Sequence, residues 1–128
     1  MATRVNLKNQ GRRLMRTKRR AEDVRILRLR KRMQLTQEIF SRVVGVKVRT
    51  LSKLEKGEEP SDQVKRSVTE TERLQKALEE VVLKDTIAGW LEEPNDAFDG
   101  LKPIEVIEHG QIDRLWAMIY DLRSGSPV

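Results

Sequence analysis

Residues 35–57 read LTQEIFSRVVGVKVRTLSKLEKG, and this stretch decides the fold. Thr36 suits the N-cap of a short helix, and Gly45 interrupts that helix, because glycine readily adopts the backbone conformation of a sharp turn. A second short helix, over roughly residues 47–56, then ends at Gly57. The apolar residues of both helices fall at helical spacing: Phe40, Val43, Val44, Leu51 and Leu54. The pattern predicts two short helices that meet at a tight turn.

The flanking sequence is also helical in its pattern. Apolar residues recur at helical spacing over residues 23–33 and again before the C-terminus: Ile26, Leu29, Met33, Ile112, Leu115, Trp116, Ile119 and Leu122. Between them, Thr69 and Glu72 predict a capping box that starts a helix, Asp85 predicts the cap of a shorter one, and Pro103 suits the first turn of another. No stretch alternates as a β-strand does. We therefore predict an all-α fold.

Charge is distributed unevenly along the 128 residues, whose net charge is +6. Residues 1–20 carry eight Lys or Arg and no acid, and residues 21–57 carry ten basic and four acidic side chains. The balance reverses later, since residues 86–128 hold three basic and eight acidic side chains. The front of the molecule is therefore suited to polyanions such as nucleic acid, and the rear would be repelled by them.

The helix pattern and this charge asymmetry together predict three regions. Residues 1–20 are expected to form a basic flexible arm, which either lies along DNA phosphates or in a minor groove, or serves as a solubilising tail. Residues 21–62 would form a helix-turn-helix DNA-binding domain. Residues 63–128 would form a helical module that binds a partner or dimerises.

The stretch from Leu35 to Gly57 resembles the Xre/Cro family of bacterial and phage repressors. The matching residues are Leu35-Thr36-Gln37, Gly45-Val46, Leu51 and Glu55-Lys56-Gly57, with Arg30 one helix earlier. The resemblance implies that the second helix of the pair reads bases in the major groove. It also implies an internal ion pair between Arg30 and Glu55.

By the same resemblance, six residues are expected to contact double-stranded operator DNA: Gln37, Lys47, Val48, Arg49, Ser52 and Lys53. Arg49 could grip a guanine with two hydrogen bonds, and Val48 could touch a thymine methyl group. The family usually has Ser or Thr where this chain has Lys47. The usual N-cap of the recognition helix is therefore expected to be missing, and Lys47 is free to reach a phosphate.

The rear of the chain resembles the C-terminal toxin-binding domain of the Xre/MbcA/ParS-type antitoxins. The residues that carry this resemblance are Trp90-Leu91, Pro94-Asn95, Phe98, Gly100, Pro103-Ile104, Gly110 and Leu122-Arg123-Ser124-Gly125. The resemblance implies a type II antitoxin that represses its own operon and neutralises a RES-type, NAD-degrading toxin. The expected toxin contacts are Trp116, Tyr120, Arg123, Ser124 and Gly125, although a buried Trp116 and a frayed C-terminal end would also fit the sequence.

An enzyme is not expected. His109 is the lone histidine and the chain has no cysteine, so the sequence predicts neither a metal site nor a cofactor. It has no glycine-rich phosphate loop, membrane span or signal peptide, which is consistent with a cytoplasmic location.

Because one recognition helix reads few base pairs, DNA binding is expected to use a homodimer or a toxin-bridged assembly. The alternatives are a stand-alone regulator whose C-terminal module only dimerises and, more distantly, a non-specific architectural DNA-binding protein.

Overall fold

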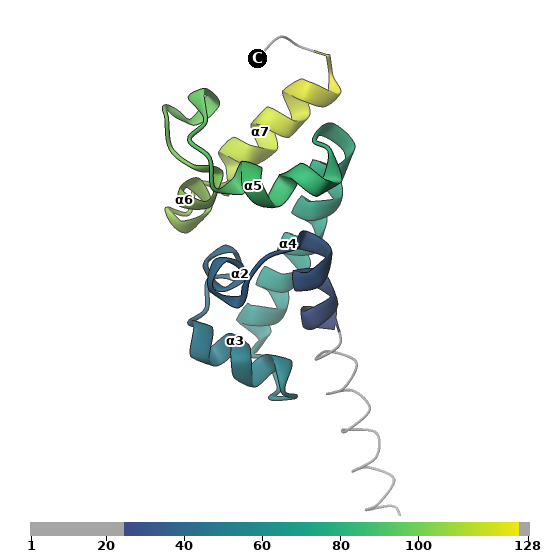
Figure 1. Cartoon of the computed structure of the whole chain (residues 1–128), viewed down its shortest axis with the longest axis vertical. Coiled ribbons are helices and arrows are strands. Elements are labelled where there is room, and N and C mark those ends of the chain that lie inside the picture. The colour runs from purple at the N-terminus through teal and green to yellow at the C-terminus, as the bar shows by residue number, and fades with distance from the viewer. Residues whose placement is uncertain (1–24, 126–128) are drawn as a thin grey trace, which may run out of the picture.

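The computed structural model describes residues 25–125, and every regular element in that range is a helix (Figure 1). A helix at residues 25–33 is followed by α2 (Gln37–Val44), α3 (Val48–Glu55), α4 (Asp62–Val81), the 3₁₀ turn η1 (Lys84–Thr86), α5 (Ile87–Leu91), η2 (Asp96–Phe98), α6 (Pro103–Glu108) and α7 (Ile112–Arg123). The all-α prediction is confirmed. The basic arm predicted for residues 1–20 lies outside the described residues.

The turn between α2 and α3 has the geometry that the sequence predicts. The Thr36 hydroxyl accepts a hydrogen bond from the backbone N–H of Ile39 at 3.3 Å, and so caps α2. Gly45 ends that helix with φ of 85°, in the left-handed region that glycine adopts with little strain. Lys47 stands at the N-cap of α3 and makes no side-chain capping bond, as expected.

The prediction that Thr69 and Glu72 start a helix is wrong. The fourth helix begins seven residues earlier, at Asp62, where the Ser61 hydroxyl accepts from the backbone N–H of Val64 at 3.2 Å. Thr69 therefore lies inside α4, where its hydroxyl donates to the Lys65 carbonyl oxygen at 3.0 Å. A Ser/Thr hydroxyl inside a helix can bond the carbonyl four residues back, so the motif does not require a helix end.

Asp85 also departs from its predicted role. It lies within η1 and caps no helix, and α5 begins without a side-chain cap at all. The Asp85 carboxylate instead accepts a hydrogen bond from Gln34 Nε2 at 3.2 Å, which joins the segment after α4 to the end of the helix at residues 25–33. A tertiary contact has replaced the local one.

Helix α4 runs from one end of the molecule to the other and supports both halves (Figure 1). Its side chains Val68, Leu74, Ala77 and Leu78 belong to one continuous cluster of buried apolar residues. That cluster extends from Ile26 and Phe40 at the front to Leu115 and Ile119 in α7. The boundary predicted between residues 62 and 63 falls at the first turn of α4 and stays a prediction.

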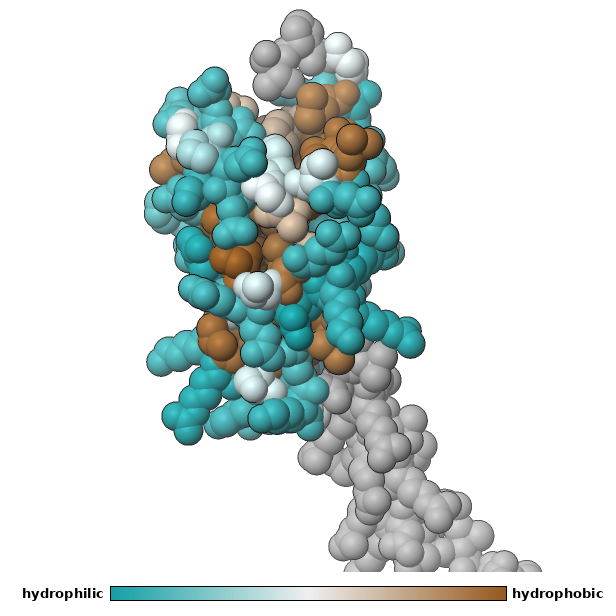
Figure 2. Space-filling model, viewed as in Figure 1, coloured by the Kyte–Doolittle hydropathy of each residue, from teal (hydrophilic) through white to brown (hydrophobic). Residues whose placement is uncertain are grey.

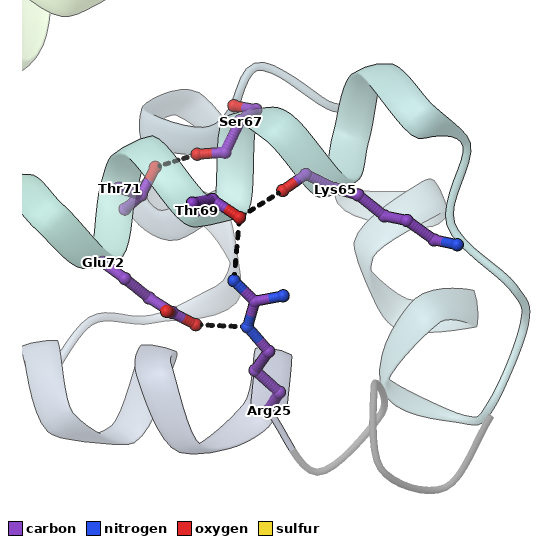
Figure 3. Close-up of polar contacts among 6 residues, drawn as sticks. All are labelled: Arg25, Lys65, Ser67, Thr69, Thr71 and Glu72. Atoms are coloured by element: carbon purple, nitrogen blue, oxygen red, sulfur yellow. Dashed lines mark hydrogen bonds and ion pairs between the residues drawn. The ribbon is translucent and has the colours of Figure 1, made fainter. Parts of the chain in front are cut away.

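Arginine–carboxylate contacts join elements that are distant in sequence. Arg25 Nε donates to Glu72 at 2.5 Å and its Nη2 donates to Thr69 at 2.9 Å, which ties the first described helix to α4 (Figure 3). In the last turn of the same helix, Arg32 donates to both oxygens of Glu79, at 2.7 and 3.0 Å.

Candidate DNA and partner interfaces

One face of α3 is basic and open to solvent. Lys47, Arg49 and Lys53 are exposed, and Val48 leaves 42% of its surface accessible, while Ser52 is half-buried. Residues 48, 49, 52 and 53 share one side of the helix, because four residues make slightly more than one turn. None of the three cations forms an ion pair among residues 25–125. The end of the molecule that carries α3 is largely hydrophilic in Figure 2. Such a surface can meet phosphates and base edges.

The only acidic residue of α3, Glu55, is bound by side chains of the protein itself. Glu55, with 7% of its side chain exposed, accepts from Arg30 Nε through one oxygen and from Gln37 Nε2 through the other, each at 2.5 Å. Arg30 also donates from Nη1 to the carbonyl oxygen of Leu35 at 3.2 Å. The ion pair expected between Arg30 and Glu55 is confirmed. Helix α3 therefore carries no unpaired carboxylate.

Gln37 makes a contact within the protein that the sequence analysis did not predict, beside its predicted contact with DNA. It is the first residue of α2, where backbone N–H groups have no partner within the helix. One of its two amide N–H groups is committed to Glu55, which fixes the side chain beside the end of α3. The second amide N–H remains available for the predicted contact with phosphate or a base edge.

A bidentate ion pair links α2 to the rear of the molecule. Arg42 donates from Nη2 and Nε to the two oxygens of Glu108 in α6, at 2.5 and 2.9 Å. The hydrogen bond from Arg42 lowers the pKa of Glu108 below its usual value, as the hydrogen bond from Arg32 lowers the pKa of Glu79. Ser67 of α4 donates to the carbonyl oxygen of Val44 at the end of α2. These contacts fix α2, and with it Gln37, relative to the C-terminal helices.

The five residues predicted to contact a toxin lie on α7 and just after it, in differing environments. Tyr120 is 70% exposed, and Ser124 and Gly125 are exposed as well. Trp116 is half-buried and lines a shallow hollow beside Glu70 and Arg73 of α4. Arg123 is held at 2.7 Å by Glu80 of α4. Residues 116, 120 and 123 share one side of α7, since they are spaced by four and three positions.

Sequence reasoning missed one exposed apolar residue at the same end. Leu83, which follows α4, is 78% exposed, and Leu122 of α7 is 39% exposed. Figure 2 shows apolar surface at the end of the molecule where α7 finishes in Figure 1. The sequence could have indicated that Leu83 is exposed, because this leucine lies between two predicted helices and belongs to the apolar face of neither.

Two other features, a metal-binding cluster and a membrane-spanning helix, are not found in residues 25–125. There, no three His, Asp or Glu side chains gather closely enough to hold a metal ion. None of the helices in this range combines the length and apolar character needed to cross a bilayer.

Comparison with known proteins agrees with this geometry. Residues 26–64 match the helix-turn-helix family. The matched range covers nearly all of the first described helix, α2, α3 and the start of α4. The fold as a whole is similar to one chain of the crystal structure of the M. tuberculosis MbcT–MbcA toxin–antitoxin complex. The TM-score is 0.67 at 23% identity, over 83% of this chain and 96% of that one. No curated protein matches the sequence. Residues 26–64 therefore form a helix-turn-helix domain, and the overall fold is similar to that of one chain of this complex.

Proposed function

We propose that the protein is the antitoxin of a type II toxin–antitoxin pair, which binds operator DNA through α3 and a toxin through its C-terminal helices. The observation that carries the proposal is the fold likeness, which extends over nearly the whole of a chain from a toxin–antitoxin complex rather than over the helix-turn-helix alone.

The DNA-binding half of the proposal rests on the exposed face of α3. Arg49 and Lys53 are unpaired among the described residues, and Glu55 is neutralised by Arg30, so the face is positive and its charges are free to meet DNA. Val48 offers an apolar contact, Ser52 a hydroxyl, and Lys47 and Gln37 flank the helix start. We infer that these six residues form the operator contact and that the chain represses its own operon.

The toxin-binding half rests on α7. Tyr120 leaves most of a large aromatic side chain exposed, and Leu122 of the same helix is also exposed; contiguous exposed apolar surface of this kind is typical of protein-binding sites. Trp116 and the paired Arg123 lie on the same side, and Ser124 and Gly125 continue it. The partner inferred from the sequence resemblance is a RES-type, NAD-degrading toxin. Binding to DNA then uses a homodimer or a toxin-bridged assembly.

Co-expression with the product of the adjacent gene tests the proposal. The neighbour alone should arrest growth, and this chain should restore growth and co-elute with the neighbour. Tyr120→Ala should weaken co-elution, whereas Glu92→Ala, which changes an exposed residue outside this surface, should not. A harmless neighbour that does not co-elute would remove the toxin pairing.

The same preparation distinguishes the alternative of a stand-alone regulator. Such a protein would self-associate through its C-terminal helices and protect a palindromic operator without any partner. Light scattering of the isolated chain and a footprint on the promoter region separate the two readings.

A further inference from the structure

A hollow of about 450 Å³ lies between the helix at residues 25–33 and α4, away from α3 and α7. Basic side chains dominate its lining, which consists of Arg25, Arg28, Leu29, Arg32, Glu72, Gln75 and Lys76. Neither proposed interface uses it. Arg28 lies about 200° around the helix from Arg30, whose side chain turns toward α3, because successive residues advance by about 100°.

An ion pair between an arginine and a glutamate lies at each end of the hollow. At one end Arg25 donates to Glu72 at 2.5 Å (Figure 3), and at the other Arg32 grips Glu79. Each pair joins the first described helix to α4. The two arginines are seven residues apart on the first helix, and the two glutamates are seven residues apart on α4. We call this repeated arrangement of the two ion pairs a ladder, with the pairs as its outer rungs.

The middle rung has cations on both helices and no anion between them. Arg28 and Lys76 line the hollow there, and neither forms an ion pair among residues 25–125. The three carboxylates within one turn of Lys76 on α4 are already held by arginines: Glu72 by Arg25, Glu79 by Arg32 and Glu80 by Arg123. The middle of the ladder therefore offers donors to an external anion.

A residue with a buried, unpaired acceptor also lines this hollow. Gln75 is 1% exposed, lines the same hollow, and its Oε1 has no hydrogen-bond partner among the described residues. Its Nε2 donates to Glu79 at 3.4 Å, so exchanging the amide nitrogen and oxygen would set two acceptors against each other. Burying an unsatisfied acceptor is costly. A ligand that accepts from Arg28 and Lys76, and that donates to Gln75 once its amide turns into the hollow, would satisfy all three groups.

We propose that this hollow is a binding site for a phosphate monoester or free phosphate. Such an anion presents oxygens to the two cations and, with a second pKa of about 6 for phosphate esters, also carries a P–OH group that can donate to Gln75. Sulfate and the phosphodiesters of DNA have no hydrogen to donate. The site therefore discriminates by hydrogen bonding and is distinct from the contacts that α3 makes with DNA.

Calorimetric titration of the full chain with inorganic phosphate and with sulfate, at about pH 6 and matched ionic strength, tests the proposal without DNA or toxin. Phosphate should bind at least tenfold more tightly than sulfate. Arg28→Gln combined with Lys76→Gln should weaken phosphate binding at least tenfold, whereas Lys31→Gln, an exposed cation of the same helix outside the hollow, should not.

Two further measurements test the role of Gln75 and the type of phosphate that binds. Gln75→Met keeps the length of the side chain and removes its acceptor, so phosphate and sulfate should then bind equally. A nucleoside monophosphate should bind and a dinucleoside phosphodiester should not, which separates a monoester from a DNA source. Equal binding of phosphate and sulfate by the unmodified chain, or undiminished phosphate binding by the Arg28/Lys76 variant, would overturn the proposal even if Gln75→Met failed to fold.

Discussion

Replacing Glu55 with alanine should be among the most damaging single substitutions in the front half of the molecule. Its carboxylate joins three segments, because Arg30 comes from the helix at residues 25–33, Gln37 begins α2, and Glu55 itself ends α3. With 7% of its side chain exposed, Glu55 has little access to water as a substitute partner. Its removal leaves Arg30 and Gln37 without their shared acceptor.

The expected loss follows from these contacts. A hydrogen bond to a charged group contributes about 1.5–3 kcal/mol, and removing one partner of a buried ion pair costs about 3–5 kcal/mol. Arg30 keeps 20% of its side chain exposed and its bond to the Leu35 carbonyl oxygen, so the penalty for its uncompensated charge is reduced. We expect Glu55→Ala to lower the free energy of unfolding by about 2–4 kcal/mol. For a domain of this size that corresponds to a fall in Tm of roughly 10 °C.

Urea denaturation of the unmodified chain and the variant measures this loss directly, with scanning calorimetry as a second reading. Glu58→Ala is the matched control, since Glu58 is exposed just beyond the same helix, and it should change stability by less than about 0.5 kcal/mol. Glu55→Gln should fall between the two, because it keeps an acceptor but not the charge. A loss below about 1 kcal/mol for Glu55→Ala would refute the reasoning, since the network would then be no stronger than an exposed ion pair.

Three other predictions concern the exposed face of α3, the turn at Gly45 and the ion pair of Glu108. Arg49→Ala with Lys53→Ala should abolish the preference for operator over random DNA while leaving Tm nearly unchanged, as measured by fluorescence anisotropy at two salt concentrations; a retained preference would contradict the assignment of α3 as the reading helix. Gly45→Ala should destabilise the fold by about 1 kcal/mol in urea, because alanine is strained at a positive φ; an unchanged midpoint would show that the turn adapts. Because the ion pair holds the pKa of Glu108 below its usual 4.5, its contribution to stability is present above that pH and is lost as pH falls through the lowered value. Denaturation of Glu108→Gln between pH 7 and pH 3 should therefore show a deficit against the unmodified chain that closes toward acid, and a deficit independent of pH would exclude the charge as its cause.

Local signals predicted the front of the molecule well. Thr36, Gly45 and Gly57 each determine backbone conformation within three or four residues of themselves, and all three occupy the predicted cap or turn. The pairing of Arg30 with Glu55 came from the family resemblance, because no local rule connects residues 25 positions apart. The resemblance therefore supplied the tertiary information that the pattern lacked.

The mistakes arose where a tertiary contact replaced a local one. Thr69 and Glu72 satisfy the spacing of a capping box, yet both bind Arg25 from another helix, and α4 passes through them without interruption (Figure 3). Asp85 is of a residue type that often caps helices, but its carboxylate instead accepts a hydrogen bond from Gln34. The orphan acceptor of Gln75 could not be predicted either, since it depends on which side chains the first described helix brings against α4.

The arrangement of the helices restricts how toxin binding could affect repression under the proposed function. The exposed face of α3 and the exposed end of α7 lie at opposite ends of the molecule, and α4 runs between them (Figure 1). One continuous apolar core and the pair between Arg42 and Glu108 join the halves, so residues 25–125 offer no flexible linker at which one half could swing against the other. A partner on α7 therefore acts by fixing how many recognition helices meet DNA together and at what spacing. Repression should then depend on the ratio of the two proteins, because a second linked recognition helix raises affinity through effective concentration only where the geometry lets both engage.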